Sequence, residues 1–544
     1  MTALAALAFL ASACTVDSNC HGFCGSAVFN FLAAPETALP VFATSVNGQS
    51  VSDMLFLPLA QIGDDLGYIA DVGFEPRLAR SWTFEDSVTI VFALDRRATW
   101  QDGEPVTAHD VVFTFDLYRD PVVNSDERND ISRITAVTAR DDATVAFTFS
   151  HAYREQFFDA TYHMPIHPVH LLDTIPRAAL RSHPFTRSPI GSGPYRLVRW
   201  DAGGTIELIA DTAFFLGAPG INRIVVQVVP DLNTTIAQLL AEETDFTDFL
   251  GPPQFVERID AAPSVRPLPF PSKTYMFATF NFRDPNSPAN PHPLFANASV
   301  REALSLAVDR VTLAQAVMGE FGRVPFGPVS PANPLWDYDV PPIPYDTARA
   351  RRLLADDGWS DADGDGVLDK GGYRLSFELI VPSSSGLRQQ LATMMQNQLR
   401  GIGAEMRVEV IEFNAWQLQS EAGRFDATFN AWAEDASPAP SMTGSWSTQG
   451  VQNWGRYSSA RFDSLITAAG RHRDDDAARI AWTEALRHIQ QDWPAIWMLA
   501  PIQVGAVHTR IENATVRPDS WGANVWEWQI SSDRMLPRDS VGVR

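Results

Sequence analysis

The sequence predicts an α/β protein of several domains, and three observations support this. A strand over residues 88–94 runs into a tight turn at Asp102 and Gly103, after which Thr107 can cap a helix. A second segment, residues 375–410, reads strand, helix, strand. With 544 residues, 45% of them hydrophobic, the chain can form about three or four domains with substantial cores.

Composition narrows the function classes. The formal net charge of −23 argues against nucleic-acid binding, because contacts with phosphates need a basic surface. The acidic surface fits a solubilising role, and it is also compatible with cationic ligands. No apolar run approaches the roughly 20 residues that span a bilayer, so we expect the body of the protein to be soluble.

The N-terminal segment contains all three cysteines: Cys14, Cys20 and Cys24. A short apolar run ends in Leu-Ala-Ser-Ala before Cys14, which resembles a bacterial lipoprotein signal, with residues 1–13 removed and Cys14 lipidated. The run lacks a basic start, so ordinary secretion and a coincidental apolar start remain open. For Cys20 and Cys24 we favour a place in an unstructured tether or a local disulfide over a metal or redox site.

The remaining elements follow in chain order. Residues 14–40 are expected to hold a tether and then an entering strand, and strands are expected near 206–208, 224–226 and 143–149. The alternating stretch 273–282 predicts a strand that leads into a proline-rich connection between domains. Ser299 and Glu302 form a capping box for a helix whose buried stripe extends to Val311.

The strand–helix–strand segment has the clearest pattern in the chain. Its helix carries apolar residues on one side, from Leu387 to Leu399, and ends at Gly401. A crossover of this length should be right-handed and bring strands 375–380 and 406–410 parallel.

Familiar catalytic motifs are missing from the sequence. We find no Gly-x-Ser-x-Gly elbow, no His-Glu-x-x-His zinc motif and no phosphate-binding loop, and therefore expect neither an enzyme nor a bound cofactor. His163, His167 and His170 come closest to a cluster. Pro165 and Pro168 interrupt that segment, so we predict solvent-facing or turn positions for the three histidines and no metal.

The acidic stretch 361–369 resembles part of a calcium loop. Oxygen ligands at Asp361, Asp363 and Asp365 with a glycine at Gly366 suit a hard cation. The position that should carry a bidentate glutamate is Gly372, and a strand follows instead of a helix. We therefore favour a turn over a calcium site.

Several motifs follow one another in a fixed order: 78–82 with 100–113, Gly191-Ser192-Gly193-Pro194-Tyr195, 281–282 with 299–304, 345–359, and 456–466. Together they resemble one protein family, the extracytoplasmic solute-binding proteins of peptide-type ABC importers, family 5. The resemblance covers nearly everything after about residue 40. One departure is Leu94-Asp95-Arg96-Arg97, where the family often has Leu-Arg-x-Gly.

The resemblance implies an α/β fold of the two-lobe periplasmic binding protein type (type II, cluster C) with an extra small domain inserted in the first lobe. The expected boundaries are 41–75, 188–277 and 502–544 for the first lobe, 76–187 for the extra domain and 278–501 for the second lobe.

The implied function is capture of a di- or oligopeptide between the lobes by hinge closure and delivery to a membrane permease with a separate ATPase. We expect a monomer in the periplasm or outside the cell membrane, attached to the membrane only by its lipid. An oligosaccharide, an opine or a nickel complex as ligand remains open, as does a surface receptor or chaperone-like protein without a permease.

The resemblance also suggests ligand-contacting residues. In peptide-binding members a Trp-x-x-Asp pattern supplies a carboxylate for the α-ammonium of the ligand, and Trp432 and Asp435 match that spacing. The pattern follows a strand at 425–430, which places it at a strand end facing the cleft. The alternative is that Asp435 only caps the next turn. Further candidates for the cleft wall are Trp416, Trp446, Asn453 and Trp454.

Overall fold

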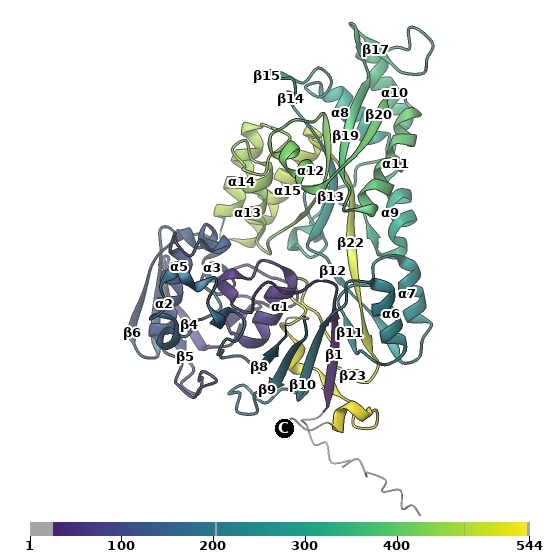
Figure 1. Cartoon of the computed structure of the whole chain (residues 1–544). Coiled ribbons are helices and arrows are strands. Elements are labelled where there is room, and N and C mark those ends of the chain that lie inside the picture. The colour runs from purple at the N-terminus through teal and green to yellow at the C-terminus, as the bar shows by residue number, and fades with distance from the viewer. Residues whose placement is uncertain (1–24, 202–203, 473, 541–544) are drawn as a thin grey trace, which may run out of the picture.

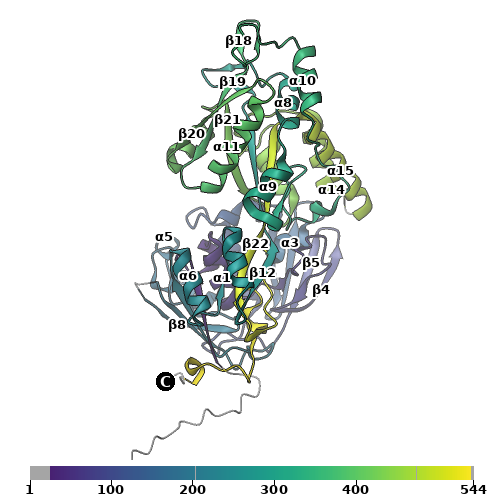
Figure 2. The same cartoon turned by 90° about the vertical axis from the view of Figure 1, so that its right-hand side faces the viewer.

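The computed structural model describes residues 25–201, 204–472 and 474–540. The predicted signal segment, Cys14, Cys20 and Cys24 lie outside them. The chain forms two bodies stacked one above the other (Figures 1 and 2). Within the described ranges, no helix combines the length and the apolar character needed to cross a membrane.

The lower body in Figure 1 contains one half of a large mixed sheet, and we call this part the first lobe. The lobe's strands follow the order β11-β1-β10-β9-β8. Strand β1 is parallel to both of its neighbours and entirely buried, so the predicted entering strand is a central one. The strand bounds are β1 (Ser26–Phe31), β8 (Tyr195–Trp200), β9 (Ile206–Ala210), β10 (Arg223–Val228) and β11 (Phe246–Thr247). The helices include α1 (Val46–Leu55), α6 (Leu232–Leu240) and α7 (Pro253–Asp260).

A separate four-stranded sheet, β4-β5-β7-β6, forms a small domain beside the first lobe (Figure 1). The strands are β4 (Ala79–Asp86), β5 (Thr89–Leu94), β6 (Ile134–Asp141) and β7 (Thr144–Phe149), and the helices are α2 (Ala108–Arg119) and α3 (Gln156–Thr161). The predicted strand–turn–helix motif is confirmed. Gly103 adopts a positive φ of 97° in the turn, and Thr107 caps α2 in a capping box with Asp110.

The upper body, here the second lobe, contains the other half of the large sheet. Strand β19 is parallel to β20, and α11 connects them, so the predicted strand–helix–strand unit is confirmed. The elements are β13 (Thr274–Phe280), β19 (Ser376–Pro382), α11 (Gly386–Arg400), β20 (Glu405–Ile411), α12 (Phe413–Glu421), β21 (Ala427–Ala433), α13 (Pro438–Trp446), α14 (Ala460–Arg471) and α15 (Asp475–Asp492).

The predicted helix over 299–311 is wrong in its start and its length. Helix α8 (Ala298–Leu306) begins after Asn297, whose side chain accepts from the N–H of Ser299. A second helix, α9 (Arg310–Met318), then begins after Asp309. Because the helix axis breaks between them, Val311 lies outside the buried stripe and is 56% exposed.

Two strand passes connect the lobes. The first is β12 (Val265–Pro271), which leads through Ser272 and Lys273 into β13. The second is β22 (Ala495–His508), which pairs with β13 at its start and with β12 and β11 towards its end. Both crossings therefore lie near residues 271–274 and 500–502. The boundaries given above for the three domains stay predictions.

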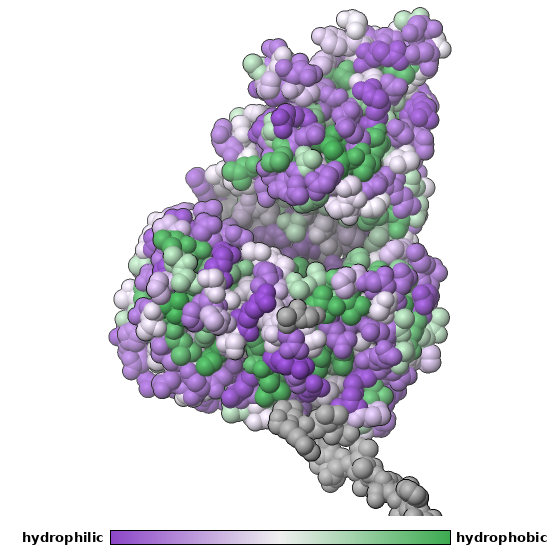
Figure 3. All heavy atoms as spheres, viewed as in Figure 1, coloured by the Kyte–Doolittle hydropathy of each residue, from purple (hydrophilic) through white to green (hydrophobic). Residues whose placement is uncertain are grey.

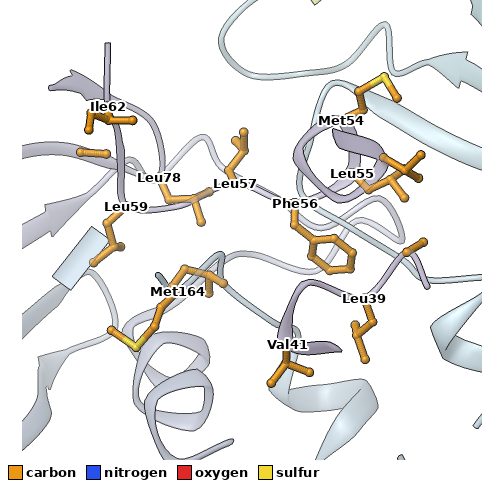
Figure 4. Packing of buried hydrophobic residues seen from close by; sticks show 14 of the residues in the cluster. Leu39, Val41, Met54, Leu55, Phe56, Leu57, Leu59, Ile62, Leu78 and Met164 are labelled. Atoms are coloured by element: carbon orange, nitrogen blue, oxygen red, sulfur yellow. The ribbon is translucent and has the colours of Figure 1, made fainter. Parts of the chain in front are cut away.

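The main core fills the first lobe and the small domain together. Figure 4 shows residues 54–59, at the end of α1 and just after it, packing with side chains from distant parts of the chain. Met164 points into this core near Leu59. The segment that contains Met164 is thus held rigidly against the first lobe.

A buried arginine holds the first lobe together at its base. The guanidinium of Arg510 is fully buried and contacts Asp245 at 2.7 and 3.0 Å and Asp539 at 2.7 Å. Arg510 also donates to the carbonyl of Ser26 in β1, and Asp245 accepts from the N–H of Val28. Segments from the start, middle and end of the chain therefore meet at one charged cluster.

We predict that Arg510→Ala lowers the free energy of unfolding of the first lobe by about 3–5 kcal/mol, because the buried Asp539 loses its counter-ion and the buried Asp245 keeps Arg538 but loses Arg510. Urea unfolding followed by tryptophan fluorescence measures this change. Arg534→Ala is the matched control, since exposed Arg534 donates only to the Thr509 carbonyl nearby. A loss for Arg510→Ala no greater than that of the control would contradict the prediction.

Candidate functional site

A hollow of about 90 Å³, open to solvent, lies where the first lobe meets the small domain. Its walls come from segments 40–62, 118–127, 162–165 and 517–523. A hollowed region is visible between the two bodies in Figure 3. The wall of the hollow between the first lobe and the small domain contains five charged side chains: Asp53, Glu127, His163, Arg517 and Asp519.

In one ion-pair network of this wall, the arginine is already paired with neighbouring carboxylates. Arg517 contacts Asp519 at 2.6 and 3.1 Å and Asp53 at 3.3 Å, and Tyr162 donates to Asp519 at 2.8 Å. Burial opposes the charge on Arg517, but the two carboxylates outweigh it and raise its pKa. Its guanidinium is thus already paired, and we do not expect it to attract an anionic ligand.

A second pair in the wall joins two parts of the small domain. His163 Nδ1 lies 2.5 Å from Oε2 of Glu127, and the imidazole is buried. Burial disfavours the imidazolium, but Glu127, with Asp435 and Asp159, raises the pKa of His163 to about 10. His163 is therefore a cation at neutral pH. His163 lies in a turn, as predicted, although its imidazole is buried. The prediction is wrong for His167, which is buried and lies outside a turn.

Sequence reasoning missed His163 because it considered the three histidines only as a metal site or as solvent-facing or turn residues. The informative signal is that Met164 and Ile166 stand two residues apart, on either side of Pro165, which fits an extended segment with an apolar side. Both residues are buried in the core, and the N–H of Ile166 donates to the carbonyl of Leu57.

Asp435 reaches the same region from the second lobe. Strand β21 continues to Ala433, three residues further than predicted, so Trp432 lies within the strand and Asp435 just after it. Asp435 is half-buried, and among the described residues no cation forms an ion pair with it. Burial raises the pKa of Asp435, while the charges of His163 and Lys273 oppose that rise. The influence of His163 shows that Asp435 lies within electrostatic reach of the hollow's wall.

Asp435 also makes local contacts. Its carboxylate accepts from the N–H of Ser437 at 3.3 Å, and its own N–H donates to Ser441. The turn-capping alternative is thus part of the geometry. A carboxylate has about four acceptor positions, so one long bond to Ser437 leaves room for a ligand.

Glu434, which sequence analysis did not single out, fixes the position of its neighbour Asp435. Its buried carboxylate accepts from the N–H of Ser330 and from the amide of Asn333. Burial raises the pKa of Glu434 to about 8, against these hydrogen bonds. Its own N–H donates to the carbonyl of Lys273, so Asp435 is connected directly to the strand crossing.

The predicted tryptophans form a row along the second lobe. Ring centroids of Trp432 lie 5.8 Å from Trp446 and 5.7 Å from Trp454, and Trp454 lies 5.8 Å from Trp416. Trp432 and Trp454 are partly exposed, whereas Trp416 and Trp446 are buried and donate to Thr428 and Tyr275. Ligand contact stays a prediction, and the exposed members fit it better.

Asn453 is buried within a loop. Its amide donates to the carbonyls of Ser447 and Tyr457, and its oxygen accepts from the N–H of Tyr457. These contacts favour a structural role over the predicted place in the cleft wall.

Two groups of side chains in the described ranges have ligand atoms close enough together for a metal ion. Glu127, Asp130 and His163 form one, but the contact between Glu127 and His163 already satisfies Nδ1. Asp361, Asp363 and Asp365 form the other and are exposed. Their oxygens accept backbone N–H groups of the loop, and Arg374 donates to Asp365 at 2.6 Å. These contacts support the turn interpretation.

Comparison with known proteins shows which family and which relatives this chain is similar to. The profile of the bacterial extracellular solute-binding proteins, family 5 Middle, matches residues 73–454. Oligopeptide-binding protein AppA of Bacillus subtilis is 28% identical over 447 residues, which cover 79% of this chain and 79% of that protein. Protein XP55 of Streptomyces lividans is 26% identical over 534 residues, covering 96% and 91%.

Solved structures agree. That of B. subtilis AppA in complex with a nonapeptide has a TM-score of 0.74 at 25% identity and covers 93% of this chain and 99% of that chain. The ABC transporter substrate-binding protein CtaP from Listeria monocytogenes has a TM-score of 0.81 at 21% identity, with the same coverage, and supports the two-lobe fold. Because the family profile spans more than half of the sequence, this chain belongs to the bacterial extracellular solute-binding proteins, family 5.

Proposed function

We propose that the chain captures a peptide between its lobes and delivers it to the permease of an ABC importer. The carrying observation is Asp435, a carboxylate of the second lobe that has no ion pair among the described residues and lies within electrostatic reach of the hollow in the first lobe. The relationship to AppA, whose structure holds a nonapeptide, supports a peptide as ligand.

The electrostatics favour an ammonium group at Asp435. A half-buried carboxylate without a counter-ion is costly, and a charge-assisted hydrogen bond from an ammonium relieves that cost. Arg517 and His163 already have carboxylate partners. The free amino terminus of a peptide is therefore the group that this part of the cleft fits.

We expect the two lobes to close because the ligand contacts both of them. The lobes are joined by strand crossings near 271–274 and 500–502, and small torsion changes there can move one lobe against the other. A ligand that touches Asp435 above and the hollow below stabilises the closed state by the difference in its contacts between the open and closed states. Trp432 and Trp454, partly exposed, supply apolar surface to cover the ligand.

The wider setting is also proposed from the family relationship. We expect a permease and a separate ATPase as partners, no chemical change of the solute, and a monomer outside the cytoplasm held by a lipid on Cys14.

We predict that Asp435→Asn weakens binding of a free nonapeptide of alternating alanine and serine by about 30-fold or more, because the ammonium loses its charged partner. The N-acetylated form of the peptide should bind wild type and variant alike. Isothermal titration calorimetry measures both. Asp339→Asn is the control, since Asp339 lies fully exposed on the same lobe. Equal losses for free and acetylated peptide would refute the ammonium role.

We also predict that the free nonapeptide makes the protein more compact, because closure brings the lobes together. Small-angle X-ray scattering should show a smaller radius of gyration with saturating peptide. Asp435→Asn at the same peptide concentration should show less of this change. An unchanged radius in a sample that calorimetry shows to be saturated would contradict hinge closure.

A further inference from the structure

The proposed function leaves one buried, charged group of the cleft without a role, the imidazole of His163. Its side chain is 2% exposed and makes edge contacts with the rings of Phe158 and Tyr162, at 5.0 and 5.3 Å. Glu127 holds Nδ1 at 2.5 Å. The orientation of the ring is thus determined on several sides by residues of the small domain.

The second ring nitrogen of His163 lacks a partner. Among the described residues none forms a hydrogen bond with Nε2, and His163 lines the hollow. The next residue, Met164, points into the core in Figure 4. A nearly buried polar nitrogen without a partner is unfavourable unless water or a ligand supplies one. The hollow is the place from which that partner comes.

The protonation state decides what kind of partner fits. With Glu127 accepting from Nδ1 and the imidazole charged, Nε2 carries a hydrogen and is a donor. The carboxylates that interact electrostatically with His163 are Glu127, Asp435, Asp159 and Asp130. A ligand oxygen that accepts from Nε2 is therefore matched to this nitrogen, whereas an ammonium is matched to Asp435.

An α-aminoacyl group carries both features on neighbouring atoms, a cationic nitrogen and a carbonyl oxygen. We propose that His163, positioned by Glu127, donates from Nε2 to the carbonyl oxygen of the first residue of the ligand while Asp435 holds the ammonium of the same residue. This inference rests on the proposed function and deepens it. The two lobes together then select ligands that begin with a free α-aminoacyl unit over simple amines.

The test pairs a variant with a ligand that lacks the acceptor. The ligands are the nonapeptide of alternating alanine and serine and the same peptide with an (E)-alkene in place of its first peptide bond. Wild type should lose about tenfold or more in affinity for the alkene form. His163→Gln should bind the normal peptide about tenfold more weakly and no longer distinguish it from the alkene form. Calorimetry gives both ratios.

The matched control is His170→Gln. His170 belongs to the same domain and contacts Asp102 at 2.8 Å, but it does not line the hollow. The His170→Gln protein should bind both peptides with wild-type affinity. The inference is overturned if His163→Gln keeps wild-type affinity or still prefers the peptide with the carbonyl. It is also overturned if wild type loses peptide binding in EDTA, because that result would point to a bridging metal.

A second measurement does not depend on a substitution of the ring. In protein labelled with ¹⁵N-histidine, the Nε2 resonance of His163, assigned by its absence from the variant's spectrum or by its change in Glu127→Gln, should shift when the nonapeptide is added. An unmoved resonance at saturation overturns the inference. If Asp435→Asn weakens binding but His163 shows no effect, only the role of His163 fails. If wild type binds no peptide, the proposed function fails with it.

Discussion

Two strand passes that belong to both lobes are the constraint on which the site depends. Strand β22 pairs with β13 in the second lobe and with β12 and β11 in the first, so one continuous backbone ladder spans the molecule. The hydrogen bonds of this ladder fix the lobes in register, and motion is confined to torsions where partners change. The cleft must therefore open beside residues 271–274 and 500–502.

The same crossing also positions the chemistry of the second lobe. The N–H of Glu434 donates to the carbonyl of Lys273, and the Glu434 carboxylate holds the loop at Ser330 and Asn333. Asp435 follows directly. Asp435 lies close to the crossing, so a small hinge rotation moves it little. The separation between the lobes changes more at residues further from the crossing. A ligand group at Asp435 can consequently bind before closure is complete.

Sequence reasoning predicted what local periodicity and capping determine. The strand–turn–helix around Thr107 and the parallel pair β19 and β20 follow from patterns within about 35 residues. It failed where distant residues decide the outcome. Asn297 and Asp309 divide a stretch that reads as one helix, and the choice between these caps and Ser299 depends on packing. The order of strands in the shared sheet rests on pairs such as β1 with β11, far apart in the sequence.

The binding site shows the same division in finer detail. Asp435 was identified through its resemblance to a family pattern, whereas His163 was not. The charge of a histidine depends on a partner residue, and no motif in the sequence identifies that partner. Glu127 lies 36 residues before it and has no motif of its own. Without its carboxylate neighbours, of which Glu127 has the largest effect, burial would lower the pKa of His163, as it does for His167, whose pKa falls to about 3. Two histidines four residues apart in one segment therefore differ in charge because a carboxylate from another segment reaches only one of them.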